Sequence, residues 1–491
     1  MKRISIFNLR IGLACNSSSS HSILILEKGQ DASTDEYNEF HWDYFTAANN
    51  ESKNNYFMET VRLAIEDVLP QSAQKEFLGK FFSQEAIYSE SSIDHQSRLL
   101  IPMNHKGRPN EAFIKDFQEF LLKPEVVIAG GNDNDDKSHD LATGDNQFLP
   151  KYPTETDNKN WIARKDVDKN YWTLFNKFSG SKMRFSFDST VAPTKASAPE
   201  LVDIKITDYC PYACEFCYQD STLKGQHASM DNIRLIAKEL GKAEVLEIAA
   251  GGGETSLHPN FVEILKIFHD EGIVVNFTTK NLNLLRTQDA SEILKYTGAI
   301  AFSVENILDI EKVYSACLDY DDQTRMTRGY GDEKSLINLQ FVMGTTSIEE
   351  FRDVLMAAAR SDLNLTLLGY KENGRGQSFS AQDYSSWLDV LKDCTKKLNK
   401  EGCYPNFSMD TALAGQYKEE LLDAGVKSST FHTTEGTFSM YIDAVANTMS
   451  PSSYIGMEQT KPFDSNWLEN YKSMGVEAPA EKPKKKIKIK G

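Results

Sequence analysis

The chain has 491 residues, of which 40% are hydrophobic and 25% are charged, so it can bury a large core and is long enough for more than one domain. Its formal net charge of −17 argues against a body that follows nucleic-acid phosphates. No apolar run reaches the roughly 18 residues of a membrane span. Seven cysteines are too few for a secreted disulfide framework, and three of them crowd together, which favours metal binding in a reducing, cytoplasmic compartment.

Residues 1–195 are expected to form a separate N-terminal region with an α+β pattern and no recognisable role. Two short apolar runs, 4–13 and 22–26, flank a serine-rich turn and predict a hairpin. Apolar residues with helical spacing follow near 57–68 and 112–122.

From about residue 200, short apolar runs alternate with amphipathic helical patterns, which is typical of βα units on a parallel sheet. The expected strands are 201–206, 245–250, 273–278, 299–304, 337–343 and 364–368. Ser347 and Glu350 predict a capping box at the start of one helix. Six such units predict an α/β fold, specifically a partial, TIM-like (βα)6 barrel over residues 196–378.

Beyond residue 378 the repeat weakens. Residues 379–480 are expected to form a small C-terminal extension packed on the barrel, with a helix that includes Trp387 and Leu391 and a hairpin made of 438–442 and 447–449. Residues 481–491 form a basic tail, which we interpret as a solvated end.

The segment after the first expected strand contains Cys210, Cys214 and Cys217 in the spacing Cys-x3-Cys-x2-Cys. Three thiolates on one loop can ligate three irons of a 4Fe-4S cube and leave the fourth iron open for an exchangeable ligand. Structural zinc sites and four-Cys electron-transfer clusters close their coordination instead, and no fourth Cys lies nearby. A zinc knuckle and chance spacing are the alternative interpretations of the motif.

This segment resembles the radical S-adenosylmethionine (SAM) superfamily, whose members carry the same spacing after the first barrel strand, with an aromatic residue before the third Cys, here Phe216. The resemblance implies one 4Fe-4S cluster, SAM bound at its open iron, and reductive cleavage of SAM to a 5′-deoxyadenosyl radical that abstracts hydrogen from a substrate. It also implies an external one-electron donor such as flavodoxin or ferredoxin. The resemblance covers roughly residues 198–375.

Further segments are similar to the SAM contacts of that family. Gly252, Gly253 and Glu254 match a motif that binds the SAM amino group, since glycines let a backbone approach a ligand and a carboxylate accepts hydrogen bonds from an ammonium group. The resemblance assigns other strand-end residues to the surroundings of SAM: Thr278 in the segment 278–281, Ser303 and Glu305 near its ribose and carboxylate, and Gly369 and Tyr370 near its adenine.

All of these residues fall at the carboxyl ends of expected strands, which is where parallel β/α barrels assemble their active sites. Lys371 and Arg375 follow the last strand. They are either exposed cations or candidates for binding an acidic group of the substrate.

The remaining cysteines do not indicate a second cluster. Cys317 and Cys394 fall on apolar helix faces and are expected in the core, whereas Cys15 and Cys403 stand alone. The segment 436–452 is similar to a hairpin of auxiliary-cluster domains in peptide-modifying relatives, but it carries serines where such domains carry cysteines. We therefore expect a single cluster.

The leading hypothesis is a radical SAM enzyme that acts on a peptide, nucleoside or small metabolite, with peptide or protein modification slightly favoured by the hairpin and the open barrel. One alternative is a non-catalytic iron-sulfur or zinc-binding interaction protein, which gives no account of Gly252, Gly253 and Glu254. Another alternative is nucleic-acid or nucleoside modification that uses the basic segment 482–490. The sequence does not reveal the substrate or the type of reaction.

Overall fold

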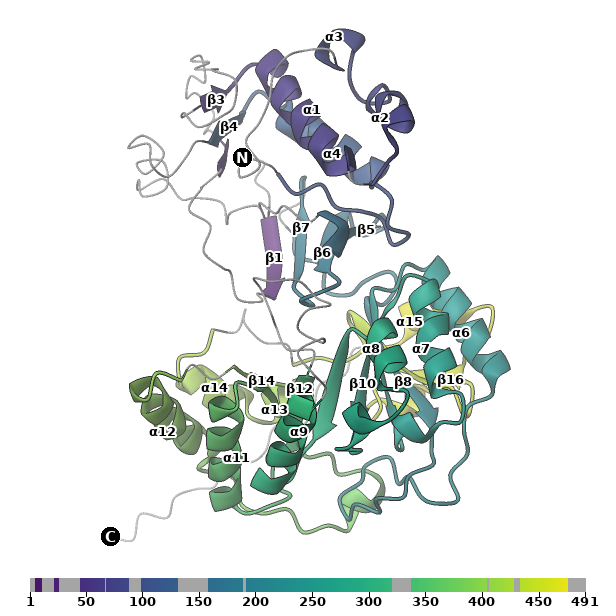
Figure 1. Cartoon of the computed structure of the whole chain (residues 1–491), viewed down its shortest axis with the longest axis vertical. Coiled ribbons are helices and arrows are strands. Elements are labelled where there is room, and N and C mark those ends of the chain that lie inside the picture. Colours follow the sequence, from purple (N-terminus) through teal and green to yellow (C-terminus); the bar gives the residue numbers. More distant parts are fainter. Residues whose placement is uncertain are drawn as a thin grey trace. The chain divides into compact units, whose positions relative to one another are not determined.

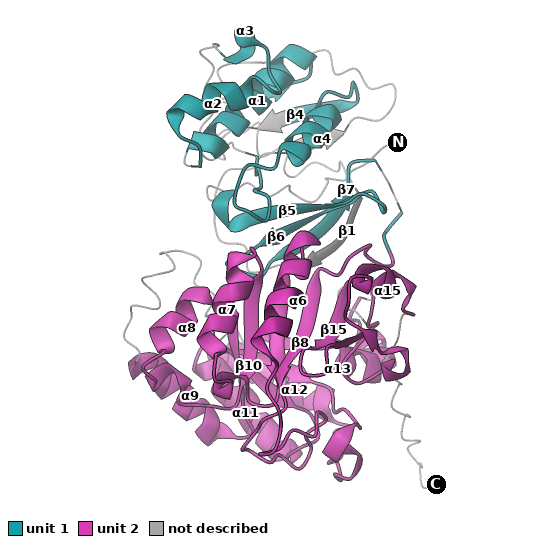
Figure 2. Ribbon diagram, turned by 90° about the vertical axis from the view of Figure 1, so that its right-hand side faces the viewer, with its two compact units in different colours: residues 1–193 teal, residues 194–491 magenta. Residues whose placement is uncertain are grey.

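The computed structural model of the chain describes residues 45–66, 68–87, 99–130, 158–188, 191–319, 337–403, 406–427 and 433–475, together with the backbone of two strands at 5–10 and 22–25. The chain divides into two compact units, residues 1–193 and 194–491 (Figure 2). Each unit has its own apolar core. Among the described residues, none of the helices has both the length and the apolar character that a membrane crossing requires.

The described part of the first unit combines helices with two antiparallel sheets (Figure 1). The helices are α1 (Asn50–Glu66), α2 (Gln71–Leu78), α3 (Gln84–Ile87) and α4 (Glu111–Leu121). One sheet has the order β1 (Ser5–Arg10), β7 (Lys182–Ser186), β6 (Tyr171–Asn176) and β5 (Trp161–Asp166), and the other has the order β2 (Ser22–Ile25), β4 (Val126–Gly130) and β3 (Phe45–Ala47). The two expected helices are therefore present as α1 and α4.

The hairpin expected between the first two apolar runs is wrong. Both runs are strands, but β1 pairs with β7 and β2 pairs with β4. The connection between them, residues 11–21, is longer than the roughly 2–5 residues that hairpin loops use. A connection of this length does not require the two runs to pair with each other, and each pairs with a strand that is distant in the sequence.

The second unit is built on one ten-stranded sheet with the order β14-β13-β12-β11-β10-β9-β8-β15-β16-β17. Every neighbouring pair from β14 to β15 is parallel. The six expected strands are present as β8 (Leu201–Thr207), β9 (Glu247–Gly252), β10 (Val274–Thr279), β11 (Ala299–Ser303), β12 (Ile337–Val342) and β13 (Asn364–Leu368). Their ends differ from the predicted ends by at most two residues, and the parallel sheet of the prediction is confirmed.

Helices connect these strands. They are α6 (Met230–Lys242), α7 (Phe261–Asp270), α8 (Ala290–Tyr296), α9 (Ile307–Asp319), α11 (Ile348–Arg360) and α12 (Trp387–Lys400), with the short helices η3 (Thr255–Leu257), η4 (Leu284–Arg286) and η5 (Gly374–Gln377). The predicted capping box is present at α11, where the Ser347 side chain accepts a hydrogen bond from the Glu350 backbone and the Glu350 side chain accepts one from the Ser347 backbone.

The two faces of this sheet differ in chemistry. In β8, Val202, Ile204 and Ile206 are buried in the same core as the apolar faces of the connecting helices, while Asp203 and Lys205 alternate with them and point to the other face. The other strands repeat this alternation. The polar face includes Asn276, Thr278, Ser303, Asn338, Gln340, Asn364 and Thr366. The helices therefore cover the apolar face, and polar side chains gather on the opposite face.

The C-terminal segment joins this sheet at both edges. β14 (Phe407–Met409) extends it beside β13, and the short helices α13 (Thr411–Gln416) and α14 (Lys418–Asp423) follow. The expected hairpin is confirmed as β15 (Ser439–Asp443) and β16 (Thr448–Ser450), followed by β17 (Lys461–Pro462) and α15 (Trp467–Ser473). β15 also pairs in parallel with β8. The hairpin thereby covers an edge that would otherwise leave backbone groups of β8 unpaired.

Two cysteines outside the motif, Cys317 and Cys394, lie as expected. Cys394 is buried in the core of the second unit, and Cys317 packs against that core. Cys403 is also partly buried there. Cys15 and the basic tail lie outside the described residues.

Candidate functional site

The three cysteines of the motif lie on one loop, residues 208–227, between β8 and α6. All three are partly exposed. The loop folds back on itself, because the Cys210 backbone donates a hydrogen bond to the carbonyl of Thr222 at 3.0 Å and the Thr222 backbone donates one to Asp208 at 3.1 Å. Burial raises the pKa of the Cys210 thiol. The sequence thus places three thiol groups on a short segment with a fixed backbone.

Residues that follow β13 hold this loop from a second side. The Arg375 guanidinium donates through Nε to the carbonyl of Cys214 at 3.0 Å and through Nη1 to the carboxylate of Asp220 at 2.9 Å. The Arg375 backbone donates to the carbonyl of Cys217 at 3.0 Å. Arg375 was a candidate for binding an acidic group of the substrate, but its side chain is instead committed to the cysteine loop.

The turn after β9 contacts the start of the cysteine loop through its backbone. Gly253 donates to the carbonyl of Thr207 at 2.7 Å, and Glu254 donates to that of Tyr209 at 2.8 Å. A Cβ atom at Gly253 would stand 2.2 Å from the Tyr209 oxygen. Gly252 has φ of +109°, and a Cβ there would stand 2.4 Å from the Thr207 oxygen. Only glycine permits this approach.

The Glu254 side chain is 2% exposed and joins the ends of two neighbouring strands. Its Oε1 accepts hydrogen bonds from the hydroxyls of Ser256 and Thr279, both at 2.6 Å, and its Oε2 accepts one from the Lys280 backbone at 2.8 Å. Glu254 therefore fixes the turn after β9 against the end of β10. From the sequence, the resemblance assigned Glu254 to SAM. The sequence did not predict its hydrogen bonds to Ser256, Thr279 and Lys280.

Lys280 lies directly beside the cysteine motif. Its Nζ is 3.3 Å from Sγ of Cys214 and forms an ion pair with Glu305. Burial by itself would lower the pKa of Lys280, but the hydrogen bond to Glu305 and the closeness of Cys214 outweigh burial and raise that pKa. The sequence pointed to this segment through Thr278, and it gave no sign of which side chain reaches the thiols.

Other predicted residues lie at the same ends of the strands. The Thr278 hydroxyl donates to the amide oxygen of Gln340 at 3.2 Å. Ser303 is paired with Gln340 in the β11–β12 register. Glu305 follows Ser303, and its backbone donates to the carboxylate of Asp309 at 3.0 Å. The structure therefore brings Thr278, Ser303 and Glu305 to one end of the sheet.

Gly369 and Tyr370 are buried in packing contacts. The Gly369 backbone donates to the carboxylate of Asp410 at 2.9 Å, and the Tyr370 hydroxyl donates to the carbonyl of Gly376. The Tyr370 ring lies 6.0 Å from that of Phe379, which lies 5.8 Å from Phe216. The three rings connect the segment after β13 to the cysteine loop.

A group of ionisable side chains that sequence reasoning missed surrounds Lys371. Its Nζ lies 4.7 Å from the ring centroid of Tyr218 and 4.6 Å from that of Tyr454. Burial raises the pKa of Asp203 to about 6 and that of Glu435 to about 7, although Lys371 opposes both shifts. Lys371 was a second candidate for an acidic substrate group, but three carboxylates of the protein, those of Asp203, Asp410 and Glu435, already face it.

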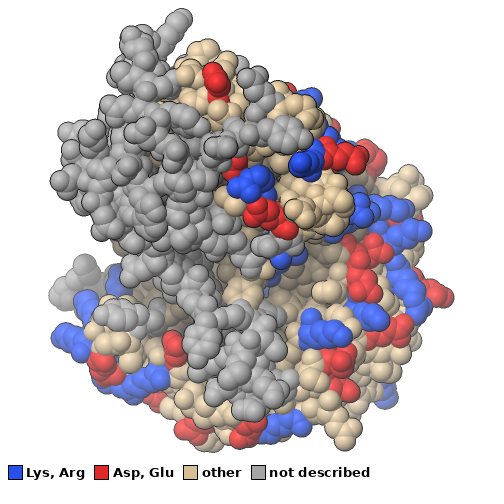
Figure 3. Space-filling view, turned by 45° about the horizontal axis from the view of Figure 1, so that its top comes forward, with Lys and Arg blue, Asp and Glu red and all other residues tan. Residues whose placement is uncertain are grey.

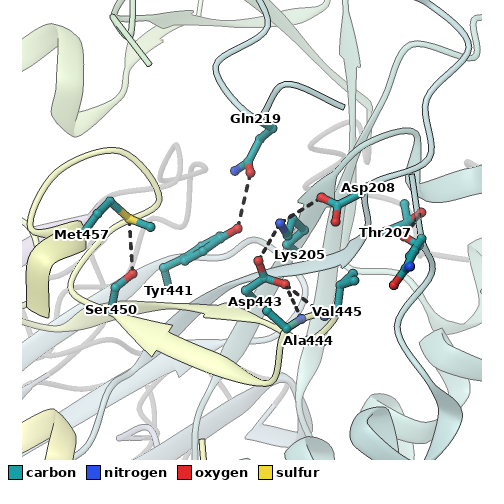
Figure 4. A network of polar contacts seen from close by, with 12 residues as sticks. Lys205, Thr207, Asp208, Gln219, Tyr441, Asp443, Ala444, Val445, Ser450 and Met457 are labelled. Atoms are coloured by element: carbon teal, nitrogen blue, oxygen red, sulfur yellow. Dashed lines mark hydrogen bonds and ion pairs between the residues drawn. The ribbon is translucent and has the colours of Figure 1, made fainter. Parts of the chain in front are cut away.

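Figure 4 shows a further network at the start of the cysteine loop. Lys205 forms ion pairs with Asp208 at 2.8 Å and with Asp443 at 2.5 Å. The Asp443 carboxylate also accepts a hydrogen bond from the Val445 backbone at 3.0 Å. This network connects β8, the cysteine loop and β15.

The serines of the C-terminal hairpin have structural partners. The Ser450 hydroxyl donates to the carbonyl of Ser452 at 2.7 Å, and the Ser452 hydroxyl accepts from the Tyr454 backbone at 3.2 Å. Both residues are buried. These hydroxyls therefore stabilise the chain after β16.

Within the described part of the chain, no three His, Cys, Asp or Glu side chains are grouped so that they could share one metal ion. The chemistry of the loop fits a different group: its three thiols suit a cluster in which each thiolate binds its own iron. At the end of β9, a Cβ at Gly251 would meet nothing within 4 Å, so the backbone there is open to a ligand. Cys210, Cys214 and Cys217 are thus the residues that fit an iron-sulfur cluster.

Comparison with known proteins gives three findings. The radical SAM superfamily model matches residues 204–373. PqqA peptide cyclases of Bradyrhizobium diazoefficiens and Ruegeria pomeroyi are 30% and 29% identical to this chain over 90 residues, which is 18% of this chain and 24% of each relative. The match thus spans about a quarter of these relatives. Streptococcus suis SuiB, solved with its precursor peptide SuiA, aligns with a TM-score of 0.48 and 15% identity over 64% of this chain and 87% of that chain.

Proposed function

Because residues 204–373 belong to the radical SAM superfamily, we propose that the chain is an enzyme that cleaves SAM reductively and abstracts hydrogen from a peptide. Cys210, Cys214 and Cys217 hold a single 4Fe-4S cluster in this proposal. When bound, the cluster supplies the electron that splits SAM into methionine and a 5′-deoxyadenosyl radical. The observation that carries the proposal is the three-thiol loop hydrogen-bonded to the glycine turn after β9.

The residues around the loop then have separable roles. Gly252 and Gly253 let the turn after β9 lie close to the cysteine loop, and SAM occupies the space beside this turn. Glu254 holds the ends of β9 and β10 in place. Phe216 and Tyr370 hold the cysteine loop against the segment after β13.

We assign the remaining predicted residues to SAM as well. Ser303 and Glu305 face its ribose and carboxylate, Thr278 lies beside it, and the segment at Gly369 lies near its adenine. Their position at the carboxyl ends of parallel strands supports this assignment, because that end of a parallel sheet is where α/β proteins bind their ligands.

The parallel sheet forms a partial, TIM-like barrel in this proposal. Helices on one face and polar side chains on the other are the pattern expected of a curved sheet with an accessible interior. The polar face, with Asp203, Asn338 and Gln340, then lines the interior in which the substrate binds.

The relatives support a peptide as the substrate, because two proteins that share a 90-residue segment of similar sequence with this chain are PqqA peptide cyclases. An external donor such as flavodoxin or ferredoxin supplies the electron, and the cytoplasm is the expected compartment. On the face of the molecule that Figure 3 draws, Lys and Arg residues are interspersed with Asp and Glu residues over the described surface. This mixture favours a peptide over a nucleic acid, which binds to basic surfaces.

Anaerobic reconstitution with iron and sulfide tests the proposed function. The parent chain is expected to gain about four irons and, once reduced, to convert SAM to 5′-deoxyadenosine. Cys214→Ala is expected to lose most of this activity, by at least about a hundredfold, since one ligand of the cluster is gone. Cys403→Ala is the matched control, because Cys403 lies outside the motif, and it is expected to behave like the parent.

Two outcomes contradict the proposal. One is a Cys214→Ala protein that keeps its iron and cleaves SAM as fast as the parent. The other is a parent chain that binds one zinc ion and does not cleave SAM, which indicates a metal-binding interaction protein instead.

A further inference from the structure

We propose that Lys280 sets the reduction potential of the cluster by donating a hydrogen bond to the Cys214 thiolate. The inference rests on the proposed function, because it requires a cluster on Cys214. Its direct observation is the distance of 3.3 Å between Nζ of Lys280 and Sγ of Cys214. Lys280 acts through this ligand, so it is a positioning residue in this proposal.

The backbone of Lys280 is fixed by a buried group. Its N–H donates to Oε2 of Glu254 at 2.8 Å, and Glu254 is itself held by the Thr279 hydroxyl. The next residue, Asn281, donates from its backbone to the Thr279 hydroxyl at 3.0 Å. The start of the Lys280 side chain is therefore placed by the joined ends of β9 and β10.

The ammonium end of Lys280 is fixed by a second group. Glu305 forms an ion pair with it, and the backbone of Glu305 is bonded to Asp309 at the start of α9. The Lys280 side chain is 26% exposed and that of Glu305 is 36% exposed. Lys280 thus spans from the end of β10 to the residues after β11 and touches the cysteine loop between them.

This arrangement has an electrostatic consequence. Reduction adds a negative charge to a cluster, so a hydrogen-bond donor or a positive charge at one of its sulfurs favours the reduced state and raises the potential. The partial burial of Lys280 limits the screening of its charge by salt. Glu305 offsets part of the effect because it adds a negative charge on the other side of the ammonium group.

A second cation, Arg375, also lies near Cys214, but it contacts the main chain of the loop and not the sulfur atom. Arg375 donates to the main-chain carbonyl of Cys214 and to that of Ser221, so it holds the backbone of the loop. Lys280 instead contacts the sulfur atom. The two cations therefore differ in what their removal is expected to change: the loop for Arg375 and the potential for Lys280.

A potentiometric titration of the reconstituted chain without SAM, followed by electron paramagnetic resonance of the reduced cluster, tests the inference. Lys280→Met is expected to shift the midpoint to a more negative value. At the midpoint potential of the parent, the ratio of reduced to oxidised cluster in Lys280→Met is expected to be about tenfold lower than in the parent. This ratio corresponds to a shift in midpoint potential of about 59 mV for one electron. Lys280→Arg keeps the donor and the charge, so its midpoint potential is expected to lie close to that of the parent. Lys266→Met, an exposed position on α7, is the matched control and titrates with the parent.

Glu305→Gln gives an independent arm, because it removes a negative charge and keeps an acceptor for Lys280. Its midpoint is expected to move to a more positive value, so this arm decides the matter even if Lys280→Met loses the cluster. A Lys280→Met protein with full iron content and the potential of the parent overturns the inference. That result leaves the proposed function intact, whereas failure of the parent to form a cluster contradicts the proposed function itself.

Discussion

At the scale of single residues, the three successive glycines at the end of β9, Gly251 to Gly253, have different constraints. A Cβ at Gly252 or Gly253 collides with carbonyl oxygens of the cysteine loop, whereas one at Gly251 meets nothing within 4 Å. The sequence showed the triple glycine but not this difference, because the colliding atoms belong to Thr207 and Tyr209, more than forty positions earlier in the chain. The structure therefore separates the glycines that packing requires from the one that packing leaves free.

Gly253→Ala is expected to lower the free energy of unfolding by about 1–3 kcal/mol, because the new methyl group would stand 2.2 Å from the Tyr209 oxygen and force the loop away. Gly251→Ala is the matched control and is expected to change stability by less than about 0.5 kcal/mol. Urea unfolding of the cluster-free chain measures both values. Equal stability of the two variants would contradict this account of the turn.

At the scale of elements, β15 and the cysteine loop are joined through β8. Lys205 in β8 pairs with Asp443 in β15 and with Asp208 at the start of the loop. Burial by itself would lower the pKa of Lys205, but the two carboxylates outweigh burial and raise it. The sequence predicted the hairpin that contains β15 correctly, yet it did not indicate that this hairpin joins the sheet beside β8.

Lys205→Met is expected to cost about 1–3 kcal/mol of unfolding free energy, because it leaves two partly buried carboxylates without their cation. Adding Asp443→Asn should restore part of the loss, so the double variant should be more stable than the sum of the single effects predicts. Lys238→Met, at an exposed position on α6, serves as the control. Strictly additive losses in thermal unfolding would show that the pair is not coupled.

At the scale of the whole second unit, the fold gathers acidic groups from distant parts of the chain. Asp203 lies in β8, Asp410 follows β14, and Glu435 precedes β15, yet all three face Lys371. Asp203 also faces Glu247, and Glu435 also faces Tyr454. Burial, together with the neighbouring carboxylates, raises the pKa of Asp203 to about 6 and that of Glu435 to about 7.

These two pKa values predict how stability depends on pH. Between pH 4 and 7 the folded chain holds protons that the unfolded chain, with carboxyl pKa values near 4, has already released. Stability is therefore expected to fall as pH rises through this window. Asp203→Asn removes one of the two groups, so its melting temperature should fall less than that of the parent between pH 5 and pH 7.5.

Asp353→Asn, at an exposed position on α11, controls for the loss of one surface carboxylate and should follow the parent at both pH values. Parallel melting curves for the parent and Asp203→Asn across this range would contradict the raised pKa of Asp203.

The sequence by itself determined the features that depend on neighbouring residues. The six central strands, the capping box at Ser347 and the cysteine motif were all predicted, because alternation, helix caps and loop spacing are set by positions only a few residues apart. Only the tertiary structure decided which strands pair with β1, β2 and β15, and which side chains surround Cys214 and Lys371. Those contacts join residues tens to hundreds of positions apart, and local propensity does not specify such partners.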